Sequence, residues 1–163
     1  MNRGRIKPIP RKGIMSIKVQ SKMKVLTTKL ENGYPLKDNI DIDDKIVVKI
    51  KTYLLTNRNA IAIASNQLFS NKRVFGMWYN GRIKIFLNPR IVSTHSDFIK
   101  EEEGCMSIAN GNKKYLVGRR KNIRITSDNH GDELYRGYDA RVIQHEIDHL
   151  EGWTIKCRYE EQN

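Results

Sequence analysis

The chain has 163 residues and a formal net charge of +12, with 39% apolar and 29% charged residues. A chain of this length suits one domain with a real core, because it buries roughly two-thirds of the surface that its unfolded form exposes. The sequence has no apolar run near the ~20 residues needed to cross a bilayer, and two cysteines are too few for a disulfide framework. We therefore expect a globular protein of a reducing, cytoplasmic compartment with no membrane partner.

The positive charge is concentrated at the N-terminus. Residues 1–30 contain nine lysines and arginines and no acid, whereas the rest of the chain has 21 bases against 18 acids. We divide the chain into a basic N-terminal arm, residues 1–30, and a single domain, residues 31–163. Such an arm can bind RNA phosphates or a ribosomal surface through counterion release, or it can simply keep the protein in solution. Both interpretations stay open.

The first predicted element in chain order is an α-helix over Asp43–Asn57. Its apolar residues recur at helical spacing and form one stripe, which consists of Ile46, Val47, Ile50 and Leu54. An aspartate at the start of this segment can cap the free N–H groups of the first turn. We expect the apolar stripe to pack in the core.

Two β-hairpins are predicted next. Residues 73–79 and 82–87 are β-rich runs separated by the sequence NG, which is a strong hairpin signal because both residues tolerate a positive φ. A second pair of strands, residues 122–126 and 133–136, flanks the turn-forming sequence SDNHGD.

The last predicted element is a helix over residues 140–152, with Asp139 in front of it and Gly152 as its C-terminal stop. Its apolar stripe consists of Val142, Ile143, Ile147 and Leu150. Strands that precede one late helix predict an α+β fold, in which antiparallel β-sheets pack around this helix.

Two histidines stand four residues apart on this helix, in the sequence QHEIDHLEG. Four residues turn a helix through about 400°, so His145 and His149 project from nearly the same side and can bind one metal ion. Glu146 points about 100° away from His145, which suits a general base that reaches a water better than a third ligand. A catalytic ion usually has three protein ligands, so another ligand must come from elsewhere.

The third ligand can be sought by elimination. The extended metalloprotease pattern needs a histidine at position 155, where Ile155 stands. Glu160 and Glu161 are poor candidates, because only 14 residues follow His149. The remaining candidates lie upstream, and they are His95, His130 and Cys105. The two histidines are readily explained as solvated loop residues.

Three segments resemble the motifs of the peptide deformylase family. EGCMS, Glu103–Ser107, and QHEIDH resemble the family sequences EGCLS and QHExDH, and AIAIASNQ, Ala60–Gln67, resembles a degraded form of GxGLAAxQ. The segments occur in the family's order, and the resemblance covers about residues 43–155. It implies a metal-dependent hydrolase that removes the formyl group from N-formylmethionine at the start of nascent polypeptides, a co-translational modification that releases formate.

The resemblance also implies a role for each matching residue. Cys105, His145 and His149 would hold the metal, Glu146 would be the catalytic base, and the Gln67 side chain and the Met106 backbone N–H would bind the oxyanion. The pocket for the methionine side chain would be lined by Ile61, Ala62, Ile63 and Val142. A buried ion pair would support the cysteine loop, and it consists of Glu103 and Arg119.

The metal implied by the resemblance is one divalent ion, natively ferrous iron, and zinc or nickel would also suit a Cys/His/His site. Ala60 and Ala62 replace the two glycines of the first motif, which would cost on the order of 1 kcal/mol at a position that needs a positive φ. Two alternatives remain: an inactive, metal-stabilised homologue that binds the ribosome, and a metallopeptidase. Many family members continue into a C-terminal helix, so the basic arm and the short end after His149 suggest a divergent member from a bacterium or a virus of bacteria.

Overall fold

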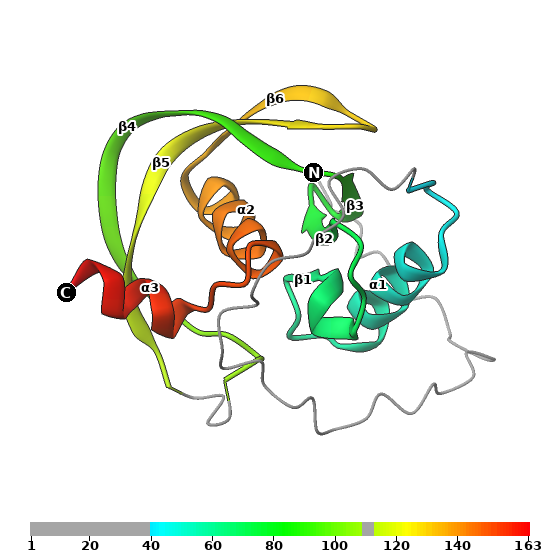
Figure 1. The fold of residues 1–163 in the computed structure, drawn as a ribbon, viewed down its shortest axis with the longest axis horizontal. Helices are drawn as coiled ribbons and strands as arrows, with labels where there is room; N and C mark the ends of the chain where they lie inside the picture. The colour runs from blue at the N-terminus through cyan, green and yellow to red at the C-terminus, as the bar shows by residue number, and fades with distance from the viewer. Residues whose placement is uncertain (1–39, 109–112) are drawn as a thin grey trace, which may run out of the picture.

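The computed structural model describes residues 40–108 and 113–163. In these residues three α-helices combine with two three-stranded antiparallel sheets (Figure 1). The second helix, α2 (Gly137–Leu150), lies between the two sheets and contacts both of them. The predicted α+β fold, with antiparallel sheets around a helix that bears the two histidines, is confirmed. No helix in the described part of the chain is long and apolar enough to span a membrane.

Helix α1 (Lys45–Thr56) forms where the apolar stripe predicted it. The Asp44 side chain caps the helix by accepting a hydrogen bond from the Ile46 N–H at 3.0 Å. The buried face of α1 consists of Ile46, Val47, Ile50, Tyr53 and Leu54. This face packs on the first sheet, where Gly76 leaves room for the Ile50 side chain, since a Cβ at position 76 would stand 2.5 Å from Ile50 Cγ2.

The first sheet contains β1 (Ala62–Ala64), β2 (Val74–Tyr79) and β3 (Arg82–Leu87) in the order β1-β2-β3. The predicted hairpin is confirmed, because β2 and β3 pair antiparallel and the two turn residues Asn80 and Gly81 have φ angles of 49° and 76°. A short 3-10 helix, η1 (Ser65–Leu68), follows β1 directly and carries Gln67.

The second sheet contains β4 (Arg90–Glu103), β5 (Tyr115–Ser127) and β6 (Gly131–Arg136) in the order β4-β5-β6. The second predicted hairpin corresponds to the end of β5 and to β6. The 14-residue strand β4 was not predicted, and His95 lies within it rather than in a loop. As an edge strand, β4 leaves most of its side chains exposed, so its sequence lacks the alternation of a half-buried strand.

Helix α2 begins three residues before the predicted start. Its first residue, Gly137, has a positive φ of 57°, and Asp139 lies inside the first turn rather than in front of the helix. A third helix, α3 (Ile155–Gln162), follows and is capped by Thr154, whose hydroxyl accepts from the Cys157 N–H at 3.3 Å. The end of the chain therefore forms a helix that the sequence analysis did not predict.

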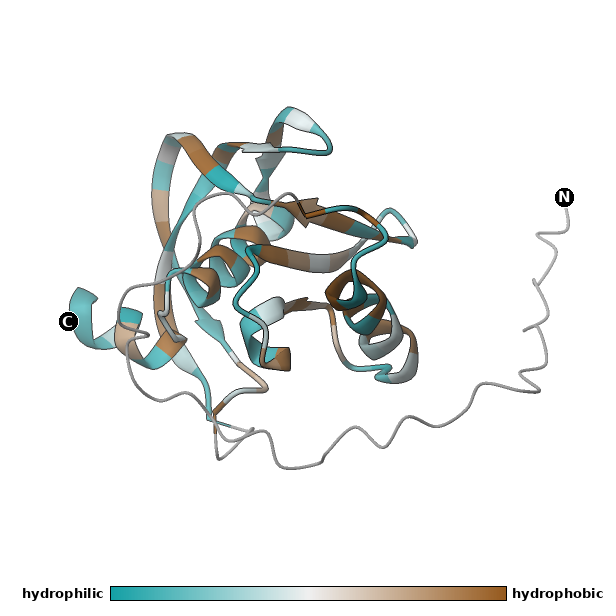
Figure 2. Ribbon diagram, turned by 45° about the vertical axis from the view of Figure 1, so that its right-hand side comes forward, coloured by the Kyte–Doolittle hydropathy of each residue, from teal (hydrophilic) through white to brown (hydrophobic). Residues whose placement is uncertain are grey.

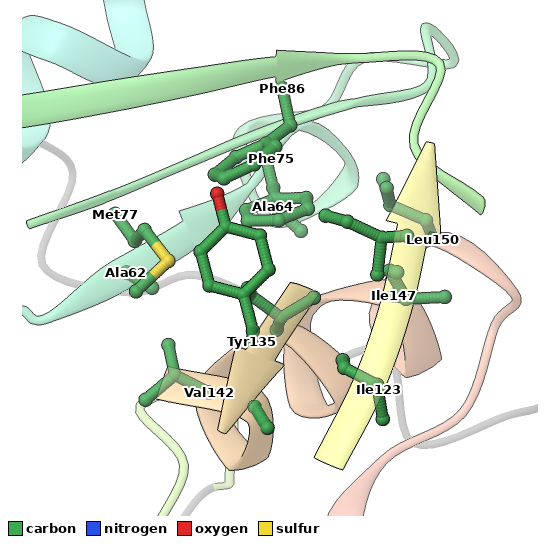
Figure 3. Packing of buried hydrophobic residues seen from close by; sticks show 13 residues of the cluster. Ala62, Ala64, Phe75, Met77, Phe86, Ile123, Tyr135, Val142, Ile147 and Leu150 are labelled. Atoms are coloured by element: carbon green, nitrogen blue, oxygen red, sulfur yellow. The ribbon is translucent and has the colours of Figure 1, made fainter. Parts of the chain in front are cut away.

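Two apolar clusters hold the sheets and helices together. The first lies between α2 and the two sheets, and its aromatic centre is a stacked pair, Phe75 and Phe86, with ring centroids 4.6 Å apart (Figure 3). The second lies between α1 and the first sheet and includes Ile50, Leu54 and Ile63. Figure 2 shows the hydrophobic segments gathered where helices and strands face one another, whereas α3 is mainly hydrophilic.

Candidate active site

The structure brings Cys105, His145 and His149 together at one point. Their ligand atoms all lie within 4.8 Å of one another, although Cys105 follows β4 and the histidines stand on α2. The Cys105 Sγ is 3.3 Å from His149 Nε2, which is 3.0 Å from His145 Nε2. One thiolate and two imidazoles form a donor set that binds zinc, iron or nickel. These three residues thus have the spacing that a metal ion requires.

The ionisation of these groups also fits a cation at their centre. Burial raises the pKa of the Cys105 thiol, but hydrogen bonds and charge interactions with His145 and His149 outweigh it and lower that pKa to about 5. Burial lowers the pKa of His145, but Cys105 and Glu103 raise it to about 10. Without a metal, the Cys105 thiolate is therefore paired with a protonated His145, and a divalent ion that displaces this proton would supply the same positive charge.

Each histidine is oriented by an acceptor behind its ring. The Nδ1 atom of His145 is 3.0 Å from Glu103 Oε2, and that of His149 is 3.1 Å from the Trp153 carbonyl oxygen. When these acceptors receive the Nδ1 proton, both Nε2 atoms face Cys105 with a free lone pair. The two histidines are thus oriented as metal ligands.

Buried ion pairs surround this cluster. Arg119 donates to both carboxylate oxygens of Glu103 at 2.9 Å, and a further hydrogen bond joins Arg119 to Asp148. Burial raises the pKa of Glu103, but hydrogen bonds from His145 and Arg119 hold it well below the ordinary range. The predicted partners Glu103 and Arg119 therefore lie together and fix the end of β4 just before Cys105.

Helix α3 adds a support that was not predicted from the sequence. Arg158 donates to both oxygens of Asp148, with Nη2–Oδ1 at 2.7 Å and Nε–Oδ2 at 3.0 Å. Ile155 is buried in one cluster with Cys105 and Val117. Asp148, which the motif left without a role, thus links α3 to Arg119. Arg158 belongs to this site because α3 places it beside Asp148, and no local sequence pattern indicates that placement.

Glu146 is almost fully buried beside the Cys105, His145 and His149 group. Its Oε2 atom has no hydrogen-bond partner among the described residues, and its side chain lines the cavity that also contains Cys105 and His145. Burial raises its pKa, although the positive charges of His149 and His145 act in the opposite direction. A buried carboxylate with an unpaired oxygen in a cavity can accept a proton from a water.

Gln67 is held in a fixed orientation on η1. Its Oε1 accepts from the Ala64 N–H at 2.9 Å, and its Nε2 donates to the Ser107 hydroxyl at 2.7 Å. Met106 follows Cys105 at the opening of the same cavity, and its sulfur accepts a hydrogen bond from the Tyr53 hydroxyl at 3.4 Å. Gln67 and Met106 therefore line the same cavity as Cys105 and His145.

The cavity lined by Cys105, His145 and Glu146 has a volume of about 280 Å³. Ile61, Ala62 and Val142 line it, as predicted for the pocket of the methionine side chain. Ile63 does not: its fully buried side chain packs in the cluster against α1, because successive residues of a strand point to opposite faces. The prediction grouped Ile63 with Ala62 and overlooked this alternation, whereas Ile61 lies before β1 and is not part of the alternating strand.

The substituted glycines of the first motif carry no strain. Neither Ala60 nor Ala62 has a positive φ, so the cost of about 1 kcal/mol considered for such a position does not arise. The left-handed residue in this region is Phe69, which ends η1 with a φ of 61°. The Ala62 methyl group lines the cavity instead and takes up part of its space.

Comparisons with known proteins agree with these observations. Residues 17–163 match the family model of polypeptide deformylase. The peptide deformylase 1 of Clostridium perfringens is 35% identical over 120 residues, which cover 69% of this chain and 80% of that protein. A Synechococcus elongatus peptide deformylase in complex with actinonin superposes with a TM-score of 0.71 at 26% identity, over 86% of this chain and 81% of that one.

The deformylase of Thermotoga maritima superposes with a TM-score of 0.66 at 26% identity, over 82% of this chain and 90% of that one. The family match extends beyond the motifs at both ends and includes α3, the helix that supports Cys105 and Asp148. The chain belongs to the peptide deformylase family.

Proposed function

We propose that this protein is a metal-dependent hydrolase that removes the N-formyl group from the formylmethionine of new polypeptides and releases formate. The observation that carries the proposal is the convergence of Cys105, His145 and His149 next to the unpaired, buried carboxylate of Glu146. Membership of the peptide deformylase family supports the reaction. The pocket that leads to this cluster has room for a side chain and a short length of peptide.

In this proposal Cys105, His145 and His149 hold one divalent ion, which supplies a Lewis acid for the formyl carbonyl and lowers the pKa of a bound water. Glu146 accepts the proton of the attacking water and delivers it to the leaving amine. Its raised pKa suits both steps, because the carboxylate must take up a proton and then release it near neutral pH.

Gln67 and Met106 would stabilise the charge that develops on the formyl oxygen. An amide nitrogen carries two N–H groups, and Gln67 uses one of them for Ser107, so the other can bind this oxygen. The hydrogen bond from Ala64 fixes the amide in this orientation before substrate arrives. The Met106 backbone N–H is the second proposed donor.

The proposed native ion is ferrous iron, with zinc and nickel as ions that the same donors accept. The test loads metal-free protein anaerobically with each ion and measures formate from formyl-Met-Ala-Ser. We expect formate with at least one ion and no cleavage of unformylated Met-Ala-Ser. Absence of formate with all three ions would contradict a deformylase, and cleavage of the unformylated peptide would indicate a metallopeptidase.

We further propose that the protein acts in the cytoplasm and that the basic arm, residues 1–30, binds ribosomal RNA. The support is the sequence alone, with nine bases and no acid, since the arm lies outside the described residues. The domain would then be residues 31–163. Ribosome co-sedimentation should be lost when residues 1–30 are deleted and should weaken steeply with salt, whereas formate release by the deleted protein should persist.

A further inference from the structure

One face of α2 forms the wall of the cavity nearest Cys105, His145 and His149. Tyr138, Arg141, Val142, His145 and Glu146 line the cavity from this helix, at the spacing of three and four residues that defines one face. Arg141 and Val142 lie about one turn from His145 along the axis, at roughly 6 Å and 4.5 Å respectively. A formyl group bound at the metal cluster would therefore direct the first side chain of the substrate toward Arg141 and Val142.

Arg141 is an unusual residue for a pocket that receives a methionine. It is only 8% exposed, and its guanidinium is held from several sides. Nη1 donates to Glu103 at 2.6 Å and to the Val117 carbonyl at 3.0 Å, and Nη2 donates to the Ile99 carbonyl at 2.7 Å. Nε is 2.8 Å from Glu101 Oε2. These contacts hold the positive group in one position at the cavity wall.

The charges around Arg141 decide which polar groups it can attract. Glu101, Glu102 and Glu103 all line the same cavity, so they balance the positive charge of the guanidinium. A carboxylate on the substrate would be repelled by these acids. A guanidinium has five N–H groups, and one on Nη2 has no partner among the described residues. This N–H can serve a neutral oxygen.

The cavity also has apolar lining that suits an unbranched chain. Ile61, Ala62 and Met106 line it, and Tyr138 and Asn59 add polar groups. The flat face of a guanidinium is weakly hydrated, so it also tolerates contact with a thioether. The cavity thus combines apolar side chains, which fit the stem of methionine, with a fixed donor.

We propose that Arg141, fixed by Glu101, is a specificity-determining residue that lets the pocket accept unbranched side chains ending in a neutral oxygen, above all methionine sulfoxide, in addition to methionine. The inference rests on the proposed deformylase function. An apolar pocket would reject the sulfoxide, because its oxygen would lose hydrogen bonds to water without replacement. A hydrogen bond from a charged donor is worth roughly ten- to a hundredfold in such a comparison.

The test measures kcat/KM for four formyl-X-Ala-Ser peptides, in which X is methionine, methionine sulfoxide, norleucine or glutamate. For the wild type we expect the sulfoxide peptide to be at least as good as the norleucine peptide and the glutamate peptide to be the poorest. In Arg141→Met, the ratio of sulfoxide to norleucine should fall about tenfold or more. Glu101→Gln, which keeps the guanidinium but loosens it, should give a smaller fall.

The matched control is Arg124→Met, the same change at an exposed residue of β5 that does not line the cavity, and its ratio should equal that of the wild type. A wild type that hydrolyses the norleucine peptide well and the sulfoxide peptide at least tenfold more slowly would overturn the inference, even if Arg141→Met fails to fold. An unchanged ratio in folded Arg141→Met would do the same. Absence of formate from the methionine peptide would instead overturn the proposed function, and the inference with it.

Discussion

Helices α1 and α2 both pack against the first sheet, but they bury different chemistry. The buried face of α1 is apolar apart from one tyrosine hydroxyl. The buried residues of α2 include five with polar or charged side chains, and these are Arg141, Gln144, Glu146, Asp148 and His149. The α1 side of the molecule is held by apolar contact, whereas the α2 side adds to its own apolar cluster the hydrogen bonds and paired charges around Cys105, His145 and His149.

This difference predicts how the two sides respond to change. A truncated apolar side chain on α1 leaves a cavity, and the loss is confined to folding stability. A changed polar residue around α2 leaves a buried partner without its hydrogen bond or opposite charge, and that partner in turn positions a metal ligand. We therefore expect variants on the α1 side to alter stability alone and variants on the α2 side to alter both stability and metal binding.

The largest effect on stability is expected for Glu103→Gln. It removes the negative charge between Arg119, Arg141 and His145, and breaking such a buried pair typically costs about 3–5 kcal/mol. Loss of the acceptor behind His145 should also weaken zinc affinity by roughly 10–100-fold. Urea denaturation and competition with a chelator measure the two quantities. Glu102→Gln, at the exposed neighbour, is the control, and an equal response of the two variants would refute the role of Glu103.

Ile50→Ala tests the α1 side. Ile50 is fully buried between α1 and the first sheet, so its truncation should cost about 2–5 kcal/mol in the free energy of unfolding. The zinc affinity and the kcat of the folded protein should stay within about twofold of wild type, because Ile50 packs in an apolar cluster whose described members include no residue of α2. Val48→Ala, on the exposed face of α1, should change stability by less than about 0.5 kcal/mol. A drop in zinc affinity with Ile50→Ala would show that the two sides are not separable.

Arg158→Gln tests whether α3 belongs to the α2 side. The variant keeps a polar side chain but removes both hydrogen bonds to the buried carboxylate of Asp148, at a cost of about 1.5–3 kcal/mol. The fluorescence of Trp153 should report the change, since the Arg158 guanidinium lies 4.4 Å from the centre of that ring. Lys156→Gln loses only an exposed pair at 3.7 Å and should cost nearly nothing. Equal stabilities of these two variants would mean that α3 is not anchored through Asp148.

The smallest effect concerns the ion pair that joins the two sheets, between Lys84 of β3 and Glu133 of β6 at 2.6 Å. Burial raises the pKa of Glu133, but hydrogen bonds from Lys84 and Tyr135 outweigh it and lower the pKa overall. A carboxyl group whose pKa is lower in the folded state stabilises the protein above its unfolded pKa and loses this contribution as the pH falls through the folded pKa.

Wild type should therefore exceed Glu133→Gln by up to about 1 kcal/mol in the free energy of unfolding at pH 7, and the difference should shrink toward pH 3. The measurement is urea denaturation at several pH values. A difference that grows on acidification would contradict the sign of this pKa shift. Asp132→Asn, at the exposed neighbour, should show no such dependence.

The elements that could be predicted from sequence are those whose residue pattern shows locally which side chains are buried or where the chain turns. The stripe of α1 and the NG turn are local signals, and both elements form where they were expected. Strand β4 has no such signal, because most of its side chains are exposed on both faces. Helix α3 was missed for a related reason: only Ile155 is buried in it, and side-chain contacts such as that of Arg158 with Asp148 hold it in place.

The residues of the candidate site also differ in whether the sequence alone could predict them. Helical spacing alone predicts that His145 and His149 point together, but the distance from Cys105 depends on the path of β4, so a resemblance was needed to select this cysteine. Arg141 could not be found from its position, because an arginine on a helix is normally solvated. Its burial follows from Glu103 and two backbone carbonyls that only the folded chain brings together.

The most direct test of the account is formate release by Glu146→Gln, measured together with its bound metal. The Oε2 atom of Glu146 has no hydrogen-bond partner among the described residues. Replacement of Glu146 should therefore leave Cys105, His145 and His149 in place. We predict one equivalent of metal, as in wild type, and a fall in kcat of roughly 100–10,000-fold. A variant that retains its metal and releases formate at the wild-type rate would contradict the assignment of the α2 side as the catalytic side.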